Sequence, residues 1–255
     1  MSEIFNILGI SDRVKYEGKR ITKKAFYMQG NLSKDEENIF TDYIDKIEIS
    51  YVLTPRNINI NTFIDEEHIY TEVGYFKVYL KVDDKVDKIS KIIQSNIPSP
   101  VVLIFEHDNN ICLSTAMKRI NKNDKSKVII EDINITDWID MKNINDNSYK
   151  FLESISLDNL EFTDFYDFYR LIDDKVYTFK NINIIGTYEI NNDKNKGEDT
   201  KAIIEKINAY NEELKKIVAK IKKESQFNKK MKLNIEANNI KNIINSLNNQ
   251  LNIKK

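Results

Sequence analysis

Ile97-Pro98-Ser99-Pro100-Val101-Val102-Leu103-Ile104-Phe105-Glu106-His107 is the stretch of sequence that decides the fold class. Its prolines end any preceding helix or strand, because proline has no backbone N–H to donate. The apolar run that follows is short and continuous, which is typical of a strand buried on both faces. Such strands lie inside sheets that helices cover, so the stretch predicts an α/β protein.

Periodic patterns on both sides of this strand predict the rest of the sheet. A helix is predicted over residues 85–95, and another begins at Ser33, which forms a capping box with Glu36. Strands are predicted over 46–53, 70–82, 111–120 and 127–133, an aromatic-rich helical region over 147–180, and a short strand over 177–185. We therefore expect an α/β (α+β) body in which helices flank a mixed central sheet of about five strands.

The composition changes at residues 191–200. Residues 201–255 contain 13 lysines, no arginine and five acids, a net charge of +8 that leaves −9 for residues 1–200. Apolar residues recur there at spacings of four and three, which predicts a helical hairpin or a coiled-coil arm. We expect an α/β body over 1–190, a linker over 191–200 and a basic, coiled-coil-like helical arm over 201–255.

Motifs that would carry chemistry are sparse. The six glycines form no phosphate-binding loop, two histidines leave little for a zinc site, and the single Cys112 fits a reducing compartment. No stretch approaches the roughly 20 apolar residues that cross a bilayer, and the N-terminus shows no secretory signal. We expect no cofactor, no metal and no membrane partner, and a cytoplasmic protein.

Two places in the sequence are candidates for a catalytic site. Glu106 and His107 are adjacent in a strand and point to opposite faces, so they are not expected to form an acid–base pair. A metal-dependent nuclease needs an acid on one strand and an acid-x-Lys pattern on the next. A degenerate version would use Glu72, Lys77 and Lys81, but Tyr79 stands where the second acid belongs. We therefore favour a protein without catalytic activity and keep a divergent nuclease as an alternative.

Basic side chains are the candidate residues for binding a nucleic acid or a protein partner. Near the N-terminus, Lys23 and Lys24 precede aromatic residues, a combination that suits nucleic acid. Lys118 and Arg119 are expected near the open end of a hairpin, where they would clamp a phosphate or an acidic partner. In the arm the candidates are Lys215, Lys216, Lys222, Lys223, Lys229 and Lys230. Lysine neutralises phosphates without reading a base sequence.

Several longer motifs occur together in this chain. They are Lys23-Lys24-Ala25-Phe26-Tyr27, Phe40-Thr41-Asp42-Tyr43-Ile44-Asp45-Lys46-Ile47, Thr54-Pro55-Arg56-Asn57-Ile58-Asn59-Ile60, Ile97-Pro98-Ser99-Pro100 and Thr136-Asp137-Trp138. On these motifs the chain resembles an uncharacterised prokaryotic family catalogued as domain of unknown function four-three-nine-one. The resemblance covers residues 1 to about 170 and, more loosely, the helical tail.

Members of that family tend to be encoded beside helicases and DNA methyltransferases in restriction-like or phage-defence gene clusters. The resemblance implies an accessory subunit of such a system, and it supplies no catalytic residues. Our leading hypothesis is therefore a DNA-targeting assembly in which the body docks a helicase or DNA methyltransferase subunit and the tail contacts DNA. The alternatives are a divergent metal-dependent nuclease and a structural homo-oligomer formed through the tail.

Overall fold

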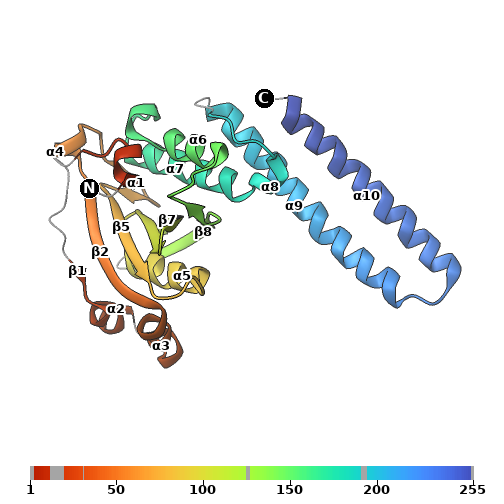
Figure 1. Cartoon of the computed structure of the whole chain (residues 1–255), viewed down its shortest axis with the longest axis horizontal. Coiled ribbons are helices and arrows are strands. Elements are labelled where there is room, and N and C mark those ends of the chain that lie inside the picture. The colour runs from red at the N-terminus through yellow and green to blue at the C-terminus, as the bar shows by residue number, and fades with distance from the viewer. Residues whose placement is uncertain (1–2, 12–19, 31, 125–126, 191–193, 254–255) are drawn as a thin grey trace. The chain divides into compact units, whose positions relative to one another are not determined.

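A seven-stranded mixed sheet is the centre of the α/β body (Figure 1). The computed structural model describes residues 3–11, 20–30, 32–124, 127–190 and 194–253. The chain divides into two units, Met1–Lys180, which holds the sheet, and Asn181–Lys255, which holds two long helices. The mixed α/β class with a C-terminal helical hairpin is confirmed.

The sheet has one parallel pair of strands among antiparallel ones. The strand order is β1 (Arg20–Ile21), β2 (Ile44–Leu53), β5 (Val73–Leu80), β6 (Val101–His107), β7 (Asn110–Ile120) and β8 (Val128–Ile135), and β9 (Ile139–Asp140) pairs with β7. β5 and β6 run parallel, and α5 (Val86–Asn96) makes the crossover that a parallel pair requires. The sheet exceeds the expected five strands because β1 and β9 are only two residues long.

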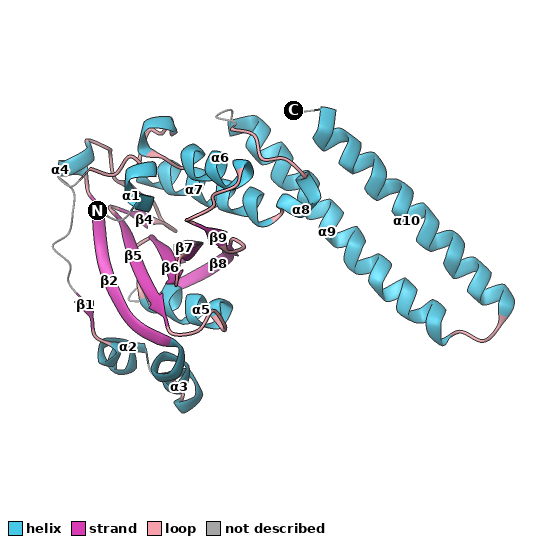
Figure 2. Cartoon of the chain, viewed as in Figure 1, coloured by secondary structure: helices cyan, strands magenta, loops and turns pink. Residues whose placement is uncertain are grey.

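The apolar run in β6 is buried as its sequence predicts. Each residue from Val101 to Phe105 is at most 1% exposed. One face of the sheet packs against α5 and against two helices near the N-terminus, α2 (Lys23–Gly30) and α3 (Lys34–Tyr43). Figure 2 shows α6 (Asp146–Ser154) and α7 (Phe165–Lys180) on the other face. Helices therefore cover both faces of the central strands.

Helix α3 begins where its capping box places it. The Ser33 hydroxyl accepts a hydrogen bond from the Glu36 amide at 3.3 Å, and the Glu36 carboxylate accepts one from the Ser33 amide at 2.8 Å. Two of the free amides at the start of the helix are satisfied in this way.

The strand predicted over residues 177–185 is wrong. Helix α7 continues to Lys180, and α8 (Ile182–Ile185) follows it. The aromatic and β-branched residues of this segment favour strands locally, but Tyr177 and Phe179 continue the buried side of α7.

Several short elements complete the body. They are α1 (Glu3–Ile7), α4 (Pro55–Ile58) and the two-stranded hairpin of β3 (Phe63–Ile64) and β4 (Ile69–Tyr70), besides a turn of 3-10 helix at Leu157–Asn159. The β3–β4 hairpin is inserted between β2 and β5, which pair directly with each other.

The second unit is built on a helical hairpin. Helix α9 (Lys194–Lys223) and helix α10 (Phe227–Ile253) pack through buried Ile217, Ala237 and Ile240. Around this core lie the partly buried side chains of Tyr210, Leu214, Ile221, Leu233 and Ile244. Residues 224–226, between the two helices, form the turn of this hairpin. Of the predicted linker, residues 191–193 lie outside the described part of the chain, and residues 194–200 are the start of α9.

None of the helices in the described ranges is both long and apolar enough to span a membrane.

Candidate functional site

Positive charge is concentrated where α9 ends and α10 begins. Residues 215–232, here called the hairpin end, contain eight lysines and a single glutamate, Glu224. All eight lysines are exposed: Lys215, Lys216, Lys220, Lys222, Lys223, Lys229, Lys230 and Lys232. Six of these are the lysines that the sequence marks as candidates. The fold therefore gathers charges from two sides of a turn into one basic surface.

The helix dipole favours only three of these eight lysines. Lys220, Lys222 and Lys223 occupy the last turn of α9, where a cation interacts favourably with the negative end of the helix dipole. Lys229 and Lys230 lie in the first turn of α10, which contains no acidic residue. A cation at that end opposes the dipole and costs about 0.3–1 kcal/mol. The lysines of α10 therefore do not stabilise their own helix.

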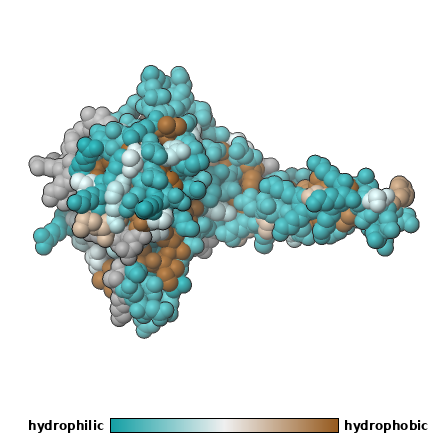
Figure 3. All heavy atoms as spheres, turned by 90° about the horizontal axis from the view of Figure 1, so that it is seen from below, coloured by the Kyte–Doolittle hydropathy of each residue, from teal (hydrophilic) through white to brown (hydrophobic). Residues whose placement is uncertain are grey.

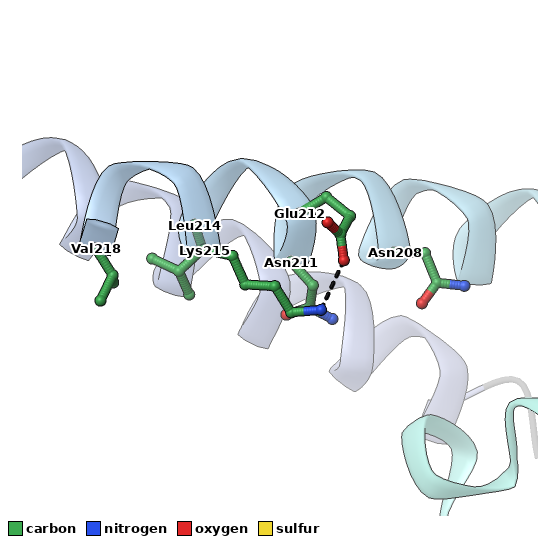
Figure 4. Close-up of a pocket in the computed structure, with 6 residues that line it drawn as sticks. All are labelled: Asn208, Asn211, Glu212, Leu214, Lys215 and Val218. Carbon is green, nitrogen blue, oxygen red and sulfur yellow. Dashed lines mark hydrogen bonds and ion pairs between the residues drawn. The ribbon is translucent and has the colours of Figure 1, made fainter. Parts of the chain in front are cut away.

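A groove along α9 reaches into the hairpin end (Figure 4). It is lined by Asn208, Asn211, Glu212, Leu214, Lys215 and Val218. Lys215 Nζ donates to Glu212 Oε1 at 2.6 Å, and this contact lowers the pKa of the Glu212 carboxyl. Lys215 is therefore neutralised within its own helix, and the positive field comes mainly from the lysines nearer the turn.

The predicted N-terminal site is partly used inside the fold. Lys23 Nζ donates to the Ile44 carbonyl at 2.5 Å, and burial, with a smaller effect of nearby Lys81, lowers its pKa. Phe26 is buried and Tyr27 is partly buried against the same core, so the ring of Phe26 offers no free stacking surface. Lys24 is the member of the pair that is exposed.

Lys118 lies towards the open end of the β6–β7 hairpin, but it is not accessible there to clamp a phosphate or an acidic partner. Lys118 is only 3% exposed, and its Nζ donates to the carbonyls of Ile97 and Ser99 at 2.8 and 3.0 Å. Burial lowers the pKa of Lys118 from 10.5 to about 7. The turn before β6 encloses the Lys118 ammonium. The sequence pattern of β7 alone does not reveal this contact with another segment.

Its neighbour Arg119 lies nearer the surface. Arg119 Nε is 3.6 Å from Glu131 Oε1 on β8, and its side chain is one-third exposed. The two residues predicted to act together therefore have different environments: Lys118 holds a turn, and Arg119 belongs to a surface ion pair.

A second group of polar side chains, here called the sheet cluster, lies on β2, β5 and β6. It consists of Lys46, Glu48, Lys77, Tyr79 and Glu106. Strand register brings them together, because Glu48 lies opposite Lys77 and Lys46 and Glu106 both lie opposite Tyr79. Lys77 Nζ is 2.5 Å from Glu106 Oε2, and Lys46 Nζ is 2.9 Å from Glu48 Oε1.

Charges and rings in the sheet cluster stabilise one another. The pKa of Glu48 is lowered, since hydrogen bonding and the charge of Lys46 outweigh the opposing effect of burial. Burial raises the pKa of Tyr79, whose ring lies 4.1 Å from Lys46 Nζ. The cluster has two cations and two anions, so it attracts neither phosphates nor metal ions strongly by net charge.

The degenerate nuclease site is not assembled from the residues that the sequence suggests. Glu72 and Lys81 lie at opposite ends of β5, and nine residues of extended strand span about 30 Å. Glu72 accepts a hydrogen bond from Ser99 Oγ, and Lys81 Nζ donates to the Thr41 carbonyl. Only Lys77 belongs to the sheet cluster. Within the described ranges, no three His, Cys, Asp or Glu side chains come together as a metal site.

Sequence reasoning missed the sheet cluster for a clear reason. Its main ion pair joins residues 29 positions apart on two parallel strands. The signal available in the sequence is that Lys46 and Glu48, like Lys77 and Tyr79, are two residues apart and thus share one face of a strand. Glu106 pairs with Lys77, while His107 Nδ1 lies 3.2 Å from the Leu80 carbonyl oxygen.

Comparison with known proteins assigns the chain to a family. A family model described as Domain of unknown function (DUF4391) matches residues 14–244, which include the whole sheet, the hairpin end and most of α10. No curated protein and no solved structure matches the chain. The match extends well beyond half of the sequence, and on that ground the chain belongs to the DUF4391 family.

Proposed function

We propose that this protein is an accessory, non-catalytic subunit of a DNA-targeting restriction-like or phage-defence system, and that its hairpin end binds the DNA backbone. The observation that carries the proposal is the group of eight exposed lysines at the hairpin end, where Lys215 is paired with Glu212 and the segment itself contains one glutamate. A polyanion is the partner that such a surface attracts.

The chemistry of the hairpin end suits phosphate contacts without sequence readout. Lysine is a flexible point charge, and bidentate recognition of guanine is a property of arginine, which residues 201–255 lack. Each phosphate that a lysine neutralises releases bound counterions, so binding weakens steeply as salt is added. The position of Lys229 and Lys230 at the unfavourable end of a helix dipole supports selection for binding rather than for stability.

The α/β body would dock the catalytic subunit. This part of the proposal rests on the gene neighbourhoods that the family resemblance implies, in which helicases and DNA methyltransferases recur. Its test is co-expression of the full chain with the helicase and the methyltransferase of one gene cluster, followed by size-exclusion chromatography. A stable complex with either enzyme is expected, and separate elution of all three proteins would contradict the docking role.

DNA binding is tested with the full chain and a labelled duplex in fluorescence anisotropy. In one variant Lys222, Lys223, Lys229 and Lys230 are all replaced by Gln. The loss of four lysine–phosphate contacts should make the plot of log binding constant against log salt concentration less steep, by about 3–4 in slope. A matched control replaces four exposed lysines of the body, Lys34, Lys88, Lys91 and Lys142, by Gln.

The two variants separate a local site from a general charge effect. Binding that survives in the control and is lost in the hairpin-end variant supports the proposal. Equal losses in both variants would mean that net charge alone draws the chain to DNA. The same assay with added Mg²⁺ or Mn²⁺ also tests the nuclease alternative, because a nuclease would cleave the duplex.

A further inference from the structure

An aromatic side chain lies exposed among the lysines of the hairpin end. Phe227 is the first residue of α10 and is 77% exposed. Met231, one helical turn further on, is 50% exposed. The lysine pairs Lys222–Lys223 and Lys229–Lys230 flank Phe227 in the sequence. Figure 3 shows hydrophobic atoms at the end of the hairpin, besides other hydrophobic patches along its mainly hydrophilic surface.

Packing within the hairpin does not account for this exposed phenylalanine. The contacts between α9 and α10 run through Ala237 and Ile240 of α10, with Leu233 and Ile244 beside them. Phe227 and Met231 lie on the opposite part of the helix surface, because they are exposed while Leu233 is partly buried. A phenyl ring that remains in water forgoes one of the largest apolar burials available to a side chain.

We propose that the hairpin end binds an unpaired nucleic-acid strand, with Phe227 stacking on a base while the flanking lysines neutralise the adjacent phosphates. This inference rests on the proposed function and names its ligand more closely. Sites for single strands combine a basic surface with exposed aromatic rings, because every base offers a face for stacking. A paired duplex hides those faces, so Phe227 would gain little from it.

Other occupants fit the hairpin end less well. A second copy would bring a second set of eight lysines against the first, and like charges repel. A lipid surface calls for a continuous apolar helix face, whereas the stripe of Phe227, Met231 and Ile235 is followed on the same face by Asn238 and Asn239. An unpaired strand needs only one or two rings between cations, which matches the arrangement on α10.

The test compares a labelled oligo-dT strand with a duplex of equal length, using the full chain at one low salt concentration. Phe227→Ala should weaken binding to the single strand about tenfold and change binding to the duplex by less than about twofold. Phe227→Tyr should retain most of the affinity for the single strand. Ile243→Ala, which truncates another exposed apolar side chain of α10, is the matched control and should change neither.

A direct signal of stacking comes from Phe227→Trp. The emission of the new indole should be quenched by oligo-dT and should stay unchanged with the duplex. Circular dichroism of each variant establishes that the helices are intact.

The outcomes separate this inference from the proposed function. If neither nucleic acid binds the unaltered chain, both proposals fail. If both bind and Phe227→Ala weakens them equally or not at all, stacking is overturned and backbone binding stands. Binding to phosphatidylserine vesicles that depends on Phe227, or a dimer that Phe227→Ala converts to a monomer in light scattering, would overturn the inference in favour of a membrane or a second copy.

Discussion

Lys77 on β5 and Glu106 on β6 form an ion pair in which the lysine side chain is almost entirely enclosed. The distance between Nζ and Oε2 is 2.5 Å, and the two side chains are 8% and 28% exposed. The rings of Phe5 and Tyr79 lie near the ammonium, with centroids 5.8 and 5.5 Å away. Lys77 therefore depends on Glu106 for most of the solvation that water would otherwise supply.

Removing the carboxylate should expose that dependence. Glu106→Gln removes the counter-charge nearest to the buried ammonium of Lys77 and leaves Glu48 on the neighbouring strand, so we expect a loss of about 2 kcal/mol in the free energy of unfolding. Urea denaturation measures it. Glu131→Gln, which breaks the exposed pair with Arg119, should cost less than about 0.5 kcal/mol. A further change of Lys77→Met in the Glu106→Gln background should restore part of the loss; equal stability of Glu106→Gln and the unaltered chain would contradict the account.

The buried Lys118 should make stability depend on pH. Its pKa is about 7 in the folded protein, and the ordinary value of 10.5 applies on unfolding. Between these values the unfolded chain binds a proton that the folded chain lacks, so the contribution of Lys118 to stability rises with pH. A neutral amine still has two N–H groups for the Ile97 and Ser99 carbonyls.

This pH effect is measured as a difference between two proteins. The unfolding free energy of the unaltered chain minus that of Lys118→Met should grow as the pH rises from about 7 to about 10. Taking the difference cancels the other titrating groups. A difference that stays constant over this range would show that Lys118 remains protonated in the fold.

Tyr169 ties α7 to the two central strands through one hydroxyl. Its O–H donates to the Val101 carbonyl at 2.8 Å and accepts from the Ala116 amide at 2.9 Å. Tyr169→Phe leaves both buried backbone groups without this partner, and we expect a loss of about 2 kcal/mol in unfolding experiments. Tyr149→Phe removes the hydroxyl of a tyrosine that is 48% exposed and should be close to neutral. Similar effects of the two changes would contradict the role of Tyr169.

The helical hairpin offers a matched pair of neighbours. Ile217 is 3% exposed in the interface with α10, whereas Val218 is 37% exposed beside the groove on α9. Ile217→Ala should destabilise the hairpin by about 2–4 kcal/mol, and Val218→Ala by well under 1 kcal/mol. Hydrogen exchange of the α9 and α10 amides reports the effect locally, and equal acceleration by both changes would contradict this packing.

Local sequence patterns correctly predict the elements that are determined by residues close together in the chain. The apolar run of β6 and the Ser33 cap of α3 are of this kind, since each depends on residues a few positions apart. The segment over 177–185 misleads because strand-favouring side chains there serve the buried side of a helix. Tertiary packing decides between helix and strand in this segment, and a short window of sequence does not include those packing contacts.

The candidate site residues divide in the same way. The lysines of the hairpin end are visible in the sequence, because they cluster within 18 positions and need no distant partner to be exposed. Lys118 and the sheet cluster were out of reach, because their environment comes from the turn at Ile97–Ser99 and from a parallel neighbour strand. Contacts between residues far apart in the sequence decide both environments.

The antiparallel course of α9 and α10 determines how the hairpin end could be regulated. The negative end of one helix dipole meets the positive end of the other at the turn, so the backbone contributions offset each other. The potential there is then set by whole charges on lysine side chains. Acetylation of one of these lysines would remove one such charge, so each acetylation would lower the positive potential of the hairpin end by one step.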